Sequence, residues 1–585
     1  MVLASMKPEG AGATAVAPLA PRSRRRIRID PSFFVMTLVT VVVGFLVLYP
    51  LGMLLLGSFW TSRPGFPGAF TWRNYATAYA DPETYQVLFN TILLVGVKTF
   101  AAAMIAVTLA WIVTRTDTPY RGALEILIIT PYFVPGILEA IGWIMLLSPR
   151  SGTINVLLMD LFGLSEAPFN IYSLGGMIWV LCLGSSSFMF LLIVSALRTM
   201  DASLEEAARI AGAGPIQTAV RVTLPLIAPV ILGAGMLSFI RSMDAFEVPV
   251  LLGLPAKIFV FSNRIFAAVE YDYPVNYGLA TALGVSLIAL TLALILIQNR
   301  LLRGKEFFVV TGKGYKPQVI RLGPLRYATF ALCIGYFLLA TVLPLSQIAL
   351  GSFMEVFGLV YADNFTLNNY KQIVLNQNIW RGMRNTIVLG GLTAVFTMLL
   401  SSIVAYIVTR TRYAGRKVLD FLVWLPWTIP GVVAGLGILW AYIRFPIPLY
   451  GTYALLVIAF VVNGLPLGVR LMAGSLRQVG PELEECARVL GASWTYTFRR
   501  VLMPLLRPAM AAVVLMLFVS FSRTLSSVIL LAGQGRELLS VALFRYTQNG
   551  EMETVSAASM VLLFISVGGL VLARRLGAFG VREVG

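Results

Sequence analysis

Two short charged segments of the chain carry the same arrangement of acidic, small and proline residues. The matched residues are Glu205, Glu206, Ala207, Ala208, Gly212, Leu224 and Pro225 in the first segment, and Glu484, Glu485, Cys486, Ala487, Gly491, Met503 and Pro504 in the second. Each matched pair is offset by 279 residues, which is the difference between Gly491 and Gly212. Because each segment is charged and lies between long apolar stretches, we expect it outside the bilayer, where it docks a soluble partner and performs no catalysis.

Both segments have the spacing of a short helix that ends at a glycine. One helical face, at positions i, i+3, i+4 and i+7, holds Leu204, Ala207, Ala208 and Ala211 in the first segment and Leu483, Cys486, Ala487 and Leu490 in the second. Gly212 and Gly491 suit the left-handed residue that ends a helix. We name residues 203–225 the first bracket and residues 482–504 the second bracket. An amphipathic helix lying on lipid is the alternative, but Ala and Cys offer little apolar area for that role.

The remaining reactive side chains argue against several kinds of chemistry. The chain has no histidine, and its three cysteines, Cys182, Cys333 and Cys486, are scattered. Their spacing predicts neither a disulfide framework nor a metal site. The phosphate-binding motif G-x-x-x-x-G-K-[ST] does not occur, so the chain by itself cannot hold the phosphates of ATP. We therefore predict no catalytic residue, no bound metal and no cofactor.

The composition is that of an integral membrane protein. Of the 585 residues, 58% are hydrophobic and 12% are charged, whereas a soluble domain has about 25% charged residues. Uncharged runs reach the length of about 20 residues that a helix needs to cross a bilayer. The sequence predicts an all-α polytopic membrane protein with twelve spans, near residues 33–56, 87–114, 126–147, 171–197, 226–250, 277–297, 327–350, 385–409, 419–443, 450–474, 507–530 and 554–574.

The net charge of +18 follows the membrane topology and does not indicate nucleic-acid binding. Lys and Arg gather in alternate loops and in the two tails, which is the positive-inside pattern. This pattern predicts that both termini and both brackets are cytoplasmic. It also predicts contacts between the basic loops and anionic lipid headgroups. Residues 1–31 are rich in Ala, Pro and Arg and are expected to form a disordered basic tail.

The repeat extends far beyond the two brackets. Val113-Thr114-Arg115-Thr116 matches residues 408–411, and Pro135-Gly136 matches Pro430-Gly431, with an offset of 295 that later falls to 279. The first copy therefore carries about sixteen extra residues, in the external segment near residues 148–170. An even number of spans per copy predicts a parallel repeat. We expect a first membrane domain at 32–300, a cytoplasmic connector at 301–326 and a second membrane domain at 327–585.

A few charged residues lie within the predicted spans. Asp244 and Glu247 lie at the end of the fifth span, and Arg523 corresponds to Asp244 by the offset of 279. Ionisable groups at membrane depth are costly, so they face the bundle interior or a water-filled cavity. We expect these three residues to line the translocation pathway, and we expect Asp244 and Arg523 to lie near each other between the halves. The alternative is that both reach water at the outer end of their spans.

At the brackets the chain resembles the inner-membrane permeases of binding-protein-dependent ABC importers. Their signature has E-A-A, three residues, G, nine residues and I-x-L-P, and here Val222 and Val501 replace Ile, Cys486 replaces Ala and Met503 replaces Leu. The resemblance implies that each bracket is a coupling helix for a separate cytoplasmic ATPase, present in two copies, which binds ATP and magnesium. It also implies an extracytoplasmic substrate-binding protein and a place in the bacterial inner membrane.

The resemblance is less specific for the substrate. Fused double permeases of this length are similar to ferric-iron importers, and the residues near Ser238-Phe239 and Phe246-Glu247-Val248-Pro249 resemble the fifth span of that group. Thiamine, polyamine and aminophosphonate importers are the alternatives within the class. The alternative class is a secondary transporter driven by an ion gradient, which predicts no duplicated bracket and usually needs carboxylates or His in several spans.

Overall fold

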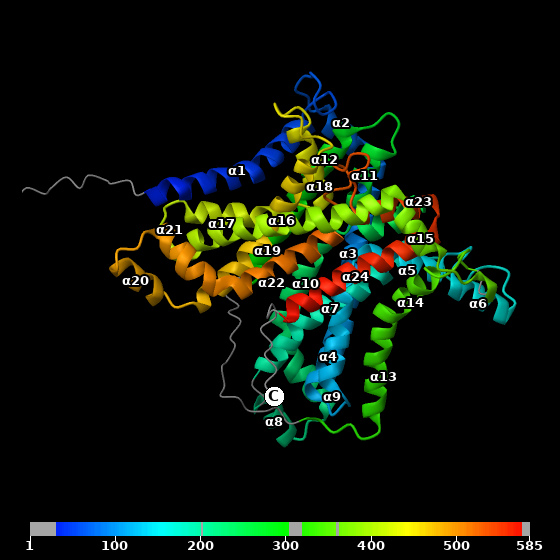
Figure 1. Ribbon diagram of the computed structural model, residues 1–585. Coiled ribbons are helices and arrows are strands. Elements are labelled where there is room, and N and C mark those ends of the chain that lie inside the picture. The colour runs from blue at the N-terminus through cyan, green and yellow to red at the C-terminus, as the bar shows by residue number, and fades with distance from the viewer. Residues whose placement is uncertain (1–30, 201–202, 303–318, 359–361, 576–585) are drawn as a thin grey trace, which may run out of the picture.

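The computed structural model describes residues 31–200, 203–302, 319–358 and 362–575, and within these ranges the chain forms helices and no strand longer than an isolated bridge (Figure 1). Ten described helices are long and apolar enough to cross a membrane, and the number is twelve if each of two bent pairs counts as one span. The prediction of an all-α polytopic protein is confirmed. Below, the first half means residues 31–302 and the second half means residues 319–575.

The spans of the two halves follow the same order. In the first half they are α1 (Pro31–Ser58), α3 (Pro82–Arg115), α4 (Arg121–Ile129) with α5 (Gly136–Leu147), α7 (Leu174–Thr199), α10 (Leu224–Ser242) and α12 (Tyr277–Leu302). In the second half they are α13 (Leu325–Phe337) continuing into α14 (Leu343–Gly351), α16 (Gln377–Arg410), α17 (Arg416–Trp424) with α18 (Gly431–Tyr442), α19 (Tyr453–Gln478), α22 (Met503–Arg523) and α24 (Met552–Arg575).

The third span of each half is broken at its centre. The predicted spans 126–147 and 419–443 are not continuous, because the helix axis bends by 94° between α4 and α5 and by 113° between α17 and α18. Pro131 and Pro135 cause the first break, and Pro426 and Pro430 cause the second. Each proline lacks a backbone donor and disfavours helical geometry in the residue before it, so two prolines four residues apart end one helix and start another.

The fifth span of each half is shorter than the sequence predicts. The predicted spans 226–250 and 507–530 end at Ser242 and Arg523 in the structure, and the apolar residues that follow, such as 250–252 and 528–531, are buried in the bundle. Two further helices come next, α11 (Phe261–Glu270) and α23 (Leu539–Asn549), and most of their residues are buried. The residues that directly follow each fifth span are apolar and buried, so the hydrophobic pattern did not mark where the span ends.

The two halves exchange their first spans. Helix α1 packs on α18 of the second half, and α14 packs on α5 of the first half. A β-carbon placed on Gly142 would lie 2.6 Å from the carbonyl oxygen of Pro344, and one placed on Gly437 would lie 3.0 Å from that of Pro50. Glycine therefore lets the backbones approach closely at both equivalent crossings. The halves form one interlocked bundle.

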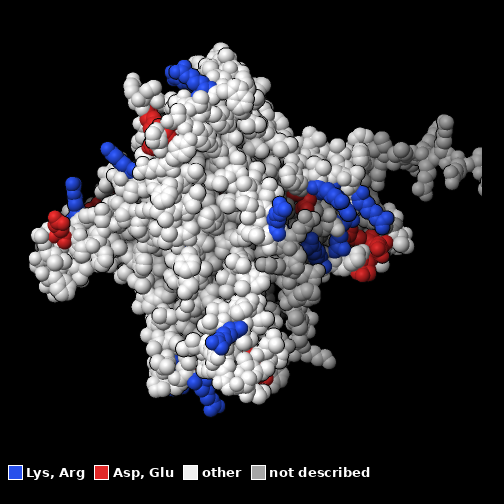
Figure 2. Space-filling model, turned by 180° about the vertical axis from the view of Figure 1, so that it is seen from behind, with Lys and Arg blue, Asp and Glu red and all other residues white. Residues whose placement is uncertain are grey.

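The remaining short helices lie at the ends of the spans. They are α2 (Arg73–Ala80), α6 (Thr153–Phe162), α8 (Ser203–Ile210), α9 (Pro215–Thr218), α15 (Asn368–Leu375), α20 (Glu482–Val489) and α21 (Trp494–Thr497). Helix α6 lies in the sixteen-residue surplus that the repeat offset predicts for the first half. Figure 2 shows Lys and Arg side chains gathered at the ends of the molecule, with a broad uncharged surface between them, as a bilayer requires.

Candidate functional site

Each bracket is a short helix, a left-handed glycine and a second helical segment that leads into a span. Gly212 has φ +88° and Gly491 has φ +78°, as the sequence predicts. The backbone N–H of Gly212 donates to Arg209 O at 2.9 Å, and that of Ala213 donates to Ala208 O at 3.0 Å. These two bonds form a Schellman motif, which satisfies the last carbonyls of α8. Figure 1 shows the brackets, at α8–α9 and α20–α21, at two separate ends of the molecule.

The first acidic residue of the first bracket faces the bundle and not the solvent. Glu205 forms an ion pair with Arg115 at the end of α3, with 3.0 Å between Oε2 and Nε. Thr223 donates to Oε1 of the same carboxylate at 2.6 Å. Arg115 also donates to the carbonyl oxygen of Leu197 in α7 at 2.9 Å. We name this set the first clamp, because it ties α8 to the ends of two spans.

The second bracket has an equivalent clamp. Glu484, which matches Glu205, lies 3.6 Å from Arg410 and accepts a hydrogen bond from Tyr406 at 2.8 Å. Arg410 donates to the carbonyl oxygen of Leu476 at 2.6 Å, as Arg115 does to the matching residue of the first half. We name this set the second clamp. The duplicated carboxylates therefore position the brackets, while other bracket residues face outward.

Each bracket carries strongly exposed apolar side chains at its tip. In the first bracket Ile210 is 88% exposed and Ile216 is 76% exposed, and in the second bracket Val489 and Leu490 are 87% and 86% exposed. Isolated exposed apolar residues are common, but side chains this open at the tip of a rigid support are typical of a protein-docking surface. Each tip is small, and the two tips lie at equivalent places in the two copies of the repeat.

The other predicted bracket residues fall into two groups. Ala207, Gly212, Pro225, Glu485, Cys486 and Gly491 are exposed, while Glu206, Ala208, Leu224, Met503 and Pro504 are half-buried and Ala487 is buried. Pro225 and Pro504 lie in the first turn of α10 and α22, where proline needs no hydrogen-bond donor. The structure thus brings every predicted bracket residue to one of two compact surfaces.

The charges near the fifth spans contact the opposite half, but not as the sequence predicts. Asp244 accepts a hydrogen bond from the backbone N–H of Gly431 at 2.5 Å, where α18 begins. Arg523 donates to the carbonyl oxygens of Tyr132 and Phe133 at 3.5 and 3.4 Å, where the helical turn after α4 ends. Each charge thus reaches the broken third span of the other half, with the sign that its helix end favours.

Asp244 and Arg523 therefore have separate partners, and the expectation that they lie near each other between the halves stays a prediction. Among the described residues no salt bridge joins them; each charge instead bonds to the backbone at the break of the opposite half. Both side chains still lie where the halves meet. Asp244 is exposed beside the buried Met243 and Phe246. Whether Asp244, Glu247 and Arg523 contact a moving substrate stays a prediction.

Two other charged side chains belong to spans of the first half, α3 and α10. Lys98 of α3 is 1% exposed and donates to Ser185 at 2.8 Å and to Ser238 at 3.1 Å. Arg241 lies 5.1 Å from the ring centroid of Phe188. Among the described residues no group of three or more His, Cys, Asp or Glu side chains has the geometry of a metal site.

The two clamp arginines were not recognised as functional from the sequence. The signal that would have found them is the repeated Val-Thr-Arg-Thr, in which a charged residue follows an apolar span at the same place of both copies. Arg115 is 2% exposed, and a buried arginine requires a buried partner. The sequence could not name that partner, since Glu205 lies 90 residues away along the chain.

The chain is similar in sequence to several known transport proteins. The ferric transport system permease protein FbpB of Actinobacillus pleuropneumoniae is 25% identical over 560 residues, which cover 94% of this chain and 79% of the relative. The Fe(3+)-transport system permease protein FbpB 2 of Haemophilus influenzae is 22% identical and covers 83% of this chain and 88% of the relative. The spermidine/putrescine transport system permease protein PotB of the same species is 30% identical over 44% of this chain and 88% of the relative.

The family comparison agrees with the duplicated architecture. Residues 98–306 and 398–578 each match the family described as binding-protein-dependent transport system inner membrane component. The matched ranges contain the two brackets and the two clamps. With its many candidate spans, this is a multi-pass inner-membrane protein. The chain belongs to the family of binding-protein-dependent inner-membrane transport components, in fused form with two copies of the domain.

Proposed function

We propose that this chain forms the whole membrane channel of an ATP-driven importer and docks one copy of a cytoplasmic ATPase on each bracket. The observation that carries the proposal is the pair of rigidly held, outward-facing apolar tips. A helix held by a buried ion pair can transmit a push from outside to the spans that hold it. ATP and magnesium would be bound by the partner, while this chain supplies no nucleotide site.

The contacts between the halves suggest how such a push reaches the pathway. Each bracket leads directly into α10 or α22, and the far end of that helix carries Asp244 or Arg523. Those two charges hold the broken third span of the opposite half. Movement of a bracket would shift Asp244 or Arg523 at the other end of the span. That shift would break or re-form the contact of this residue with the broken third span of the opposite half. Alternating access would follow from rocking of the two halves.

We further propose ferric iron as the substrate, delivered by an extracytoplasmic binding protein. The support is that two relatives, each matching most of the chain, are named as permeases for ferric iron. The polyamine relative, which matches less than half of the chain, marks the main alternative. In this scheme the brackets and both termini are cytoplasmic, and α6 lies on the side of the binding protein.

Docking is tested by substitution of the two tips. We expect Ile210→Asp and Leu490→Asp each to weaken retention of the co-expressed ATPase, because burial of one such side chain stabilises an interface by about 1.5–3 kcal/mol. Leu161→Asp on α6 is the matched control, since Leu161 is also exposed, at 69%, and lies on the opposite side. If a variant with both Ile210→Asp and Leu490→Asp still retains the ATPase fully, the docking proposal is contradicted.

The importer itself is tested by reconstitution in liposomes. Iron(III) should accumulate only when the ATPase, ATP and the loaded binding protein are all present. Uptake by the purified chain in response to an ion gradient would overturn the importer proposal. ATP-dependent uptake of spermidine without uptake of iron would leave the importer intact and overturn the substrate alone.

A further inference from the structure

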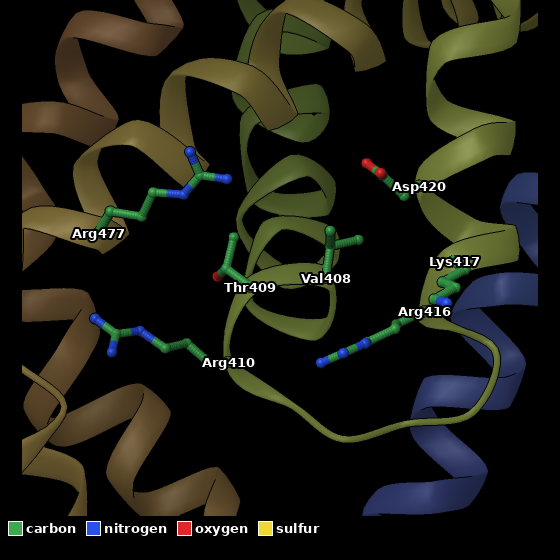
Figure 3. Close-up of a pocket in the computed structure, with 7 residues that line it drawn as sticks. All are labelled: Val408, Thr409, Arg410, Arg416, Lys417, Asp420 and Arg477. Carbon is green, nitrogen blue, oxygen red and sulfur yellow. The ribbon is translucent and has the colours of Figure 1, made fainter.

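Two hollows lie at equivalent places of the repeat, each where the second, third and fourth spans of a half end together. The second-half hollow, of about 440 Å³, lies between α16, α17 and α19 and is lined by Arg410, Arg416, Lys417, Asp420 and Arg477 (Figure 3). The first-half hollow, of about 690 Å³, lies between α3, α4 and α7 and is lined by Arg115, Asp117, Arg121 and Arg198. Three of these arginines match between the halves.

The first-half hollow is electrically balanced. Arg198 forms an ion pair with Glu125 at 2.5 Å, and Arg115 is held by Glu205 in the first clamp. Arg121 donates to the carbonyl oxygen of Thr116, and Asp117 adds a further negative charge to the lining. An anion entering this hollow would therefore meet three arginines whose charges are matched by three carboxylates.

The second-half hollow is not balanced. Asp420 stands at the place of Glu125 in the repeat, 295 residues later, and its side chain is one methylene shorter. In the described part of the chain no ion pair joins Asp420 to Arg477, the equivalent of Arg198. Arg416 donates to the carbonyl oxygen of Thr411 at 2.9 Å, as Arg121 does to that of Thr116. In the lining of this hollow, however, Arg416, Lys417 and Arg477 have only the carboxylate of Asp420 to match their charges. Figure 3 shows Arg416 and Arg477 extending toward the space from opposite sides.

Apolar side chains lie next to this charged hollow. Tyr413, in the loop between α16 and α17, bonds to the hydroxyl of Thr37 at 3.2 Å and packs on the ring of Phe33 at 5.8 Å. Phe33 and Phe34, at the start of the first span, are exposed. Positive side chains beside exposed aromatic rings at the end of a span match the anionic headgroup and the apolar acyl chains of a lipid.

We propose that the second-half hollow binds the phosphate of an anionic phospholipid headgroup, held by Arg416, Lys417 and Arg477. Arginine and lysine form strong charge-assisted hydrogen bonds to phosphate, and basic pockets between spans are suited to such headgroups. The acyl chains would follow the apolar surface at the start of α1. Because Arg410 both lines the hollow and holds the second bracket, the bound lipid would sit beside one bracket and not the other.

The test is native mass spectrometry of the purified full-length chain, titrated with phosphatidylglycerol and, separately, with phosphatidylcholine. The wild type should retain one phosphatidylglycerol more tightly than the rest. Arg416→Gln with Arg477→Gln should weaken that lipid roughly 25-fold, since each basic residue contributes about fivefold near an anionic lipid. The matched control, Arg121→Gln with Arg198→Gln in the first-half hollow, should leave it in place.

Two carboxylate variants test the same reasoning without removing any cation. Asp420→Glu restores the length of Glu125, so it should pair with Arg477 and weaken the bound lipid. Glu125→Gln frees Arg198, so it should create a second tight lipid in the first-half hollow. If neither variant changes lipid retention, the charge-balance argument is wrong.

Three further outcomes would overturn the proposal. Equal losses in both double arginine variants would mean that the binding is unspecific attraction. Displacement of the lipid by inorganic phosphate at similar concentration would identify the site as one for a free anion. Loss of the lipid when the ATPase binds would mean that an acidic protein side chain, and not a headgroup, occupies the hollow.

Discussion

Removal of one charge from the first clamp should loosen α8 and leave α20 unchanged. The perturbation is Glu205→Gln, which keeps an oxygen to accept the hydrogen bond from Thr223 and removes only the negative charge. Arg115 is 2% exposed and Glu205 13% exposed, so water can do little to replace the lost partner. The variant isolates the electrostatic part of the contact between bracket and bundle.

The magnitude follows from the geometry of this pair. At the N–O distance of 3.0 Å, an effective dielectric constant of about 20 gives an attraction of about 5 kcal/mol. Desolvation offsets much of that, and breaking a buried pair by removing one partner costs about 3–5 kcal/mol. Because the amide of the variant still accepts a hydrogen bond, we expect about 2–3 kcal/mol, which is roughly a 30- to 150-fold change in the opening equilibrium.

Hydrogen exchange measures this opening directly. The amides of Ala211, Gly212 and Ala213 bond within the first bracket and should lose protection in the variant. The amides of α20 serve as the internal control, because the second clamp is independent, and Glu484→Gln should give the reciprocal result. Unchanged exchange in α8, or equal changes in both brackets, would refute the reasoning.

Three further predictions concern the backbone and the interface between the halves. Gly212→Val should reduce ATP hydrolysis coupled to transport, because a φ of +88° costs a branched residue about 1–2 kcal/mol; normal coupling would contradict this. Gly142→Ala should lower the thermal unfolding temperature more than Gly437→Ala, since the added carbon meets the backbone at 2.6 Å and not 3.0 Å; the reverse order would count against the assigned crossings. Asp244→Asn and Arg523→Gln should have additive effects on transport, within about 0.5 kcal/mol, because each contacts a separate stretch of backbone; strong coupling would restore the direct pair.

The fifth spans illustrate what sequence reasoning misses in a membrane bundle. Composition identified the apolar segments, but it extended the fifth spans through residues that the structure folds back toward α11 and α23. A fully buried segment has no polar side, so neither its end nor its direction leaves a mark in the hydrophobic pattern. Pro135 and Pro430 are visible in the sequence as possible kinks. The presence of a proline does not by itself predict a bend as large as 94° or 113°.

The sequence by itself determined the parts that depend on local chemistry and on duplication. The offset of 279 residues identified both brackets, and the chemistry of glycine identified the left-handed turns at Gly212 and Gly491. Tertiary structure alone decided which groups meet: Arg115 with Glu205 in the first clamp, and Asp244 with the backbone of Gly431. The reason is that side-chain charge and backbone strain are local properties, whereas the partner of a buried charge depends on how helices far apart in the chain cross.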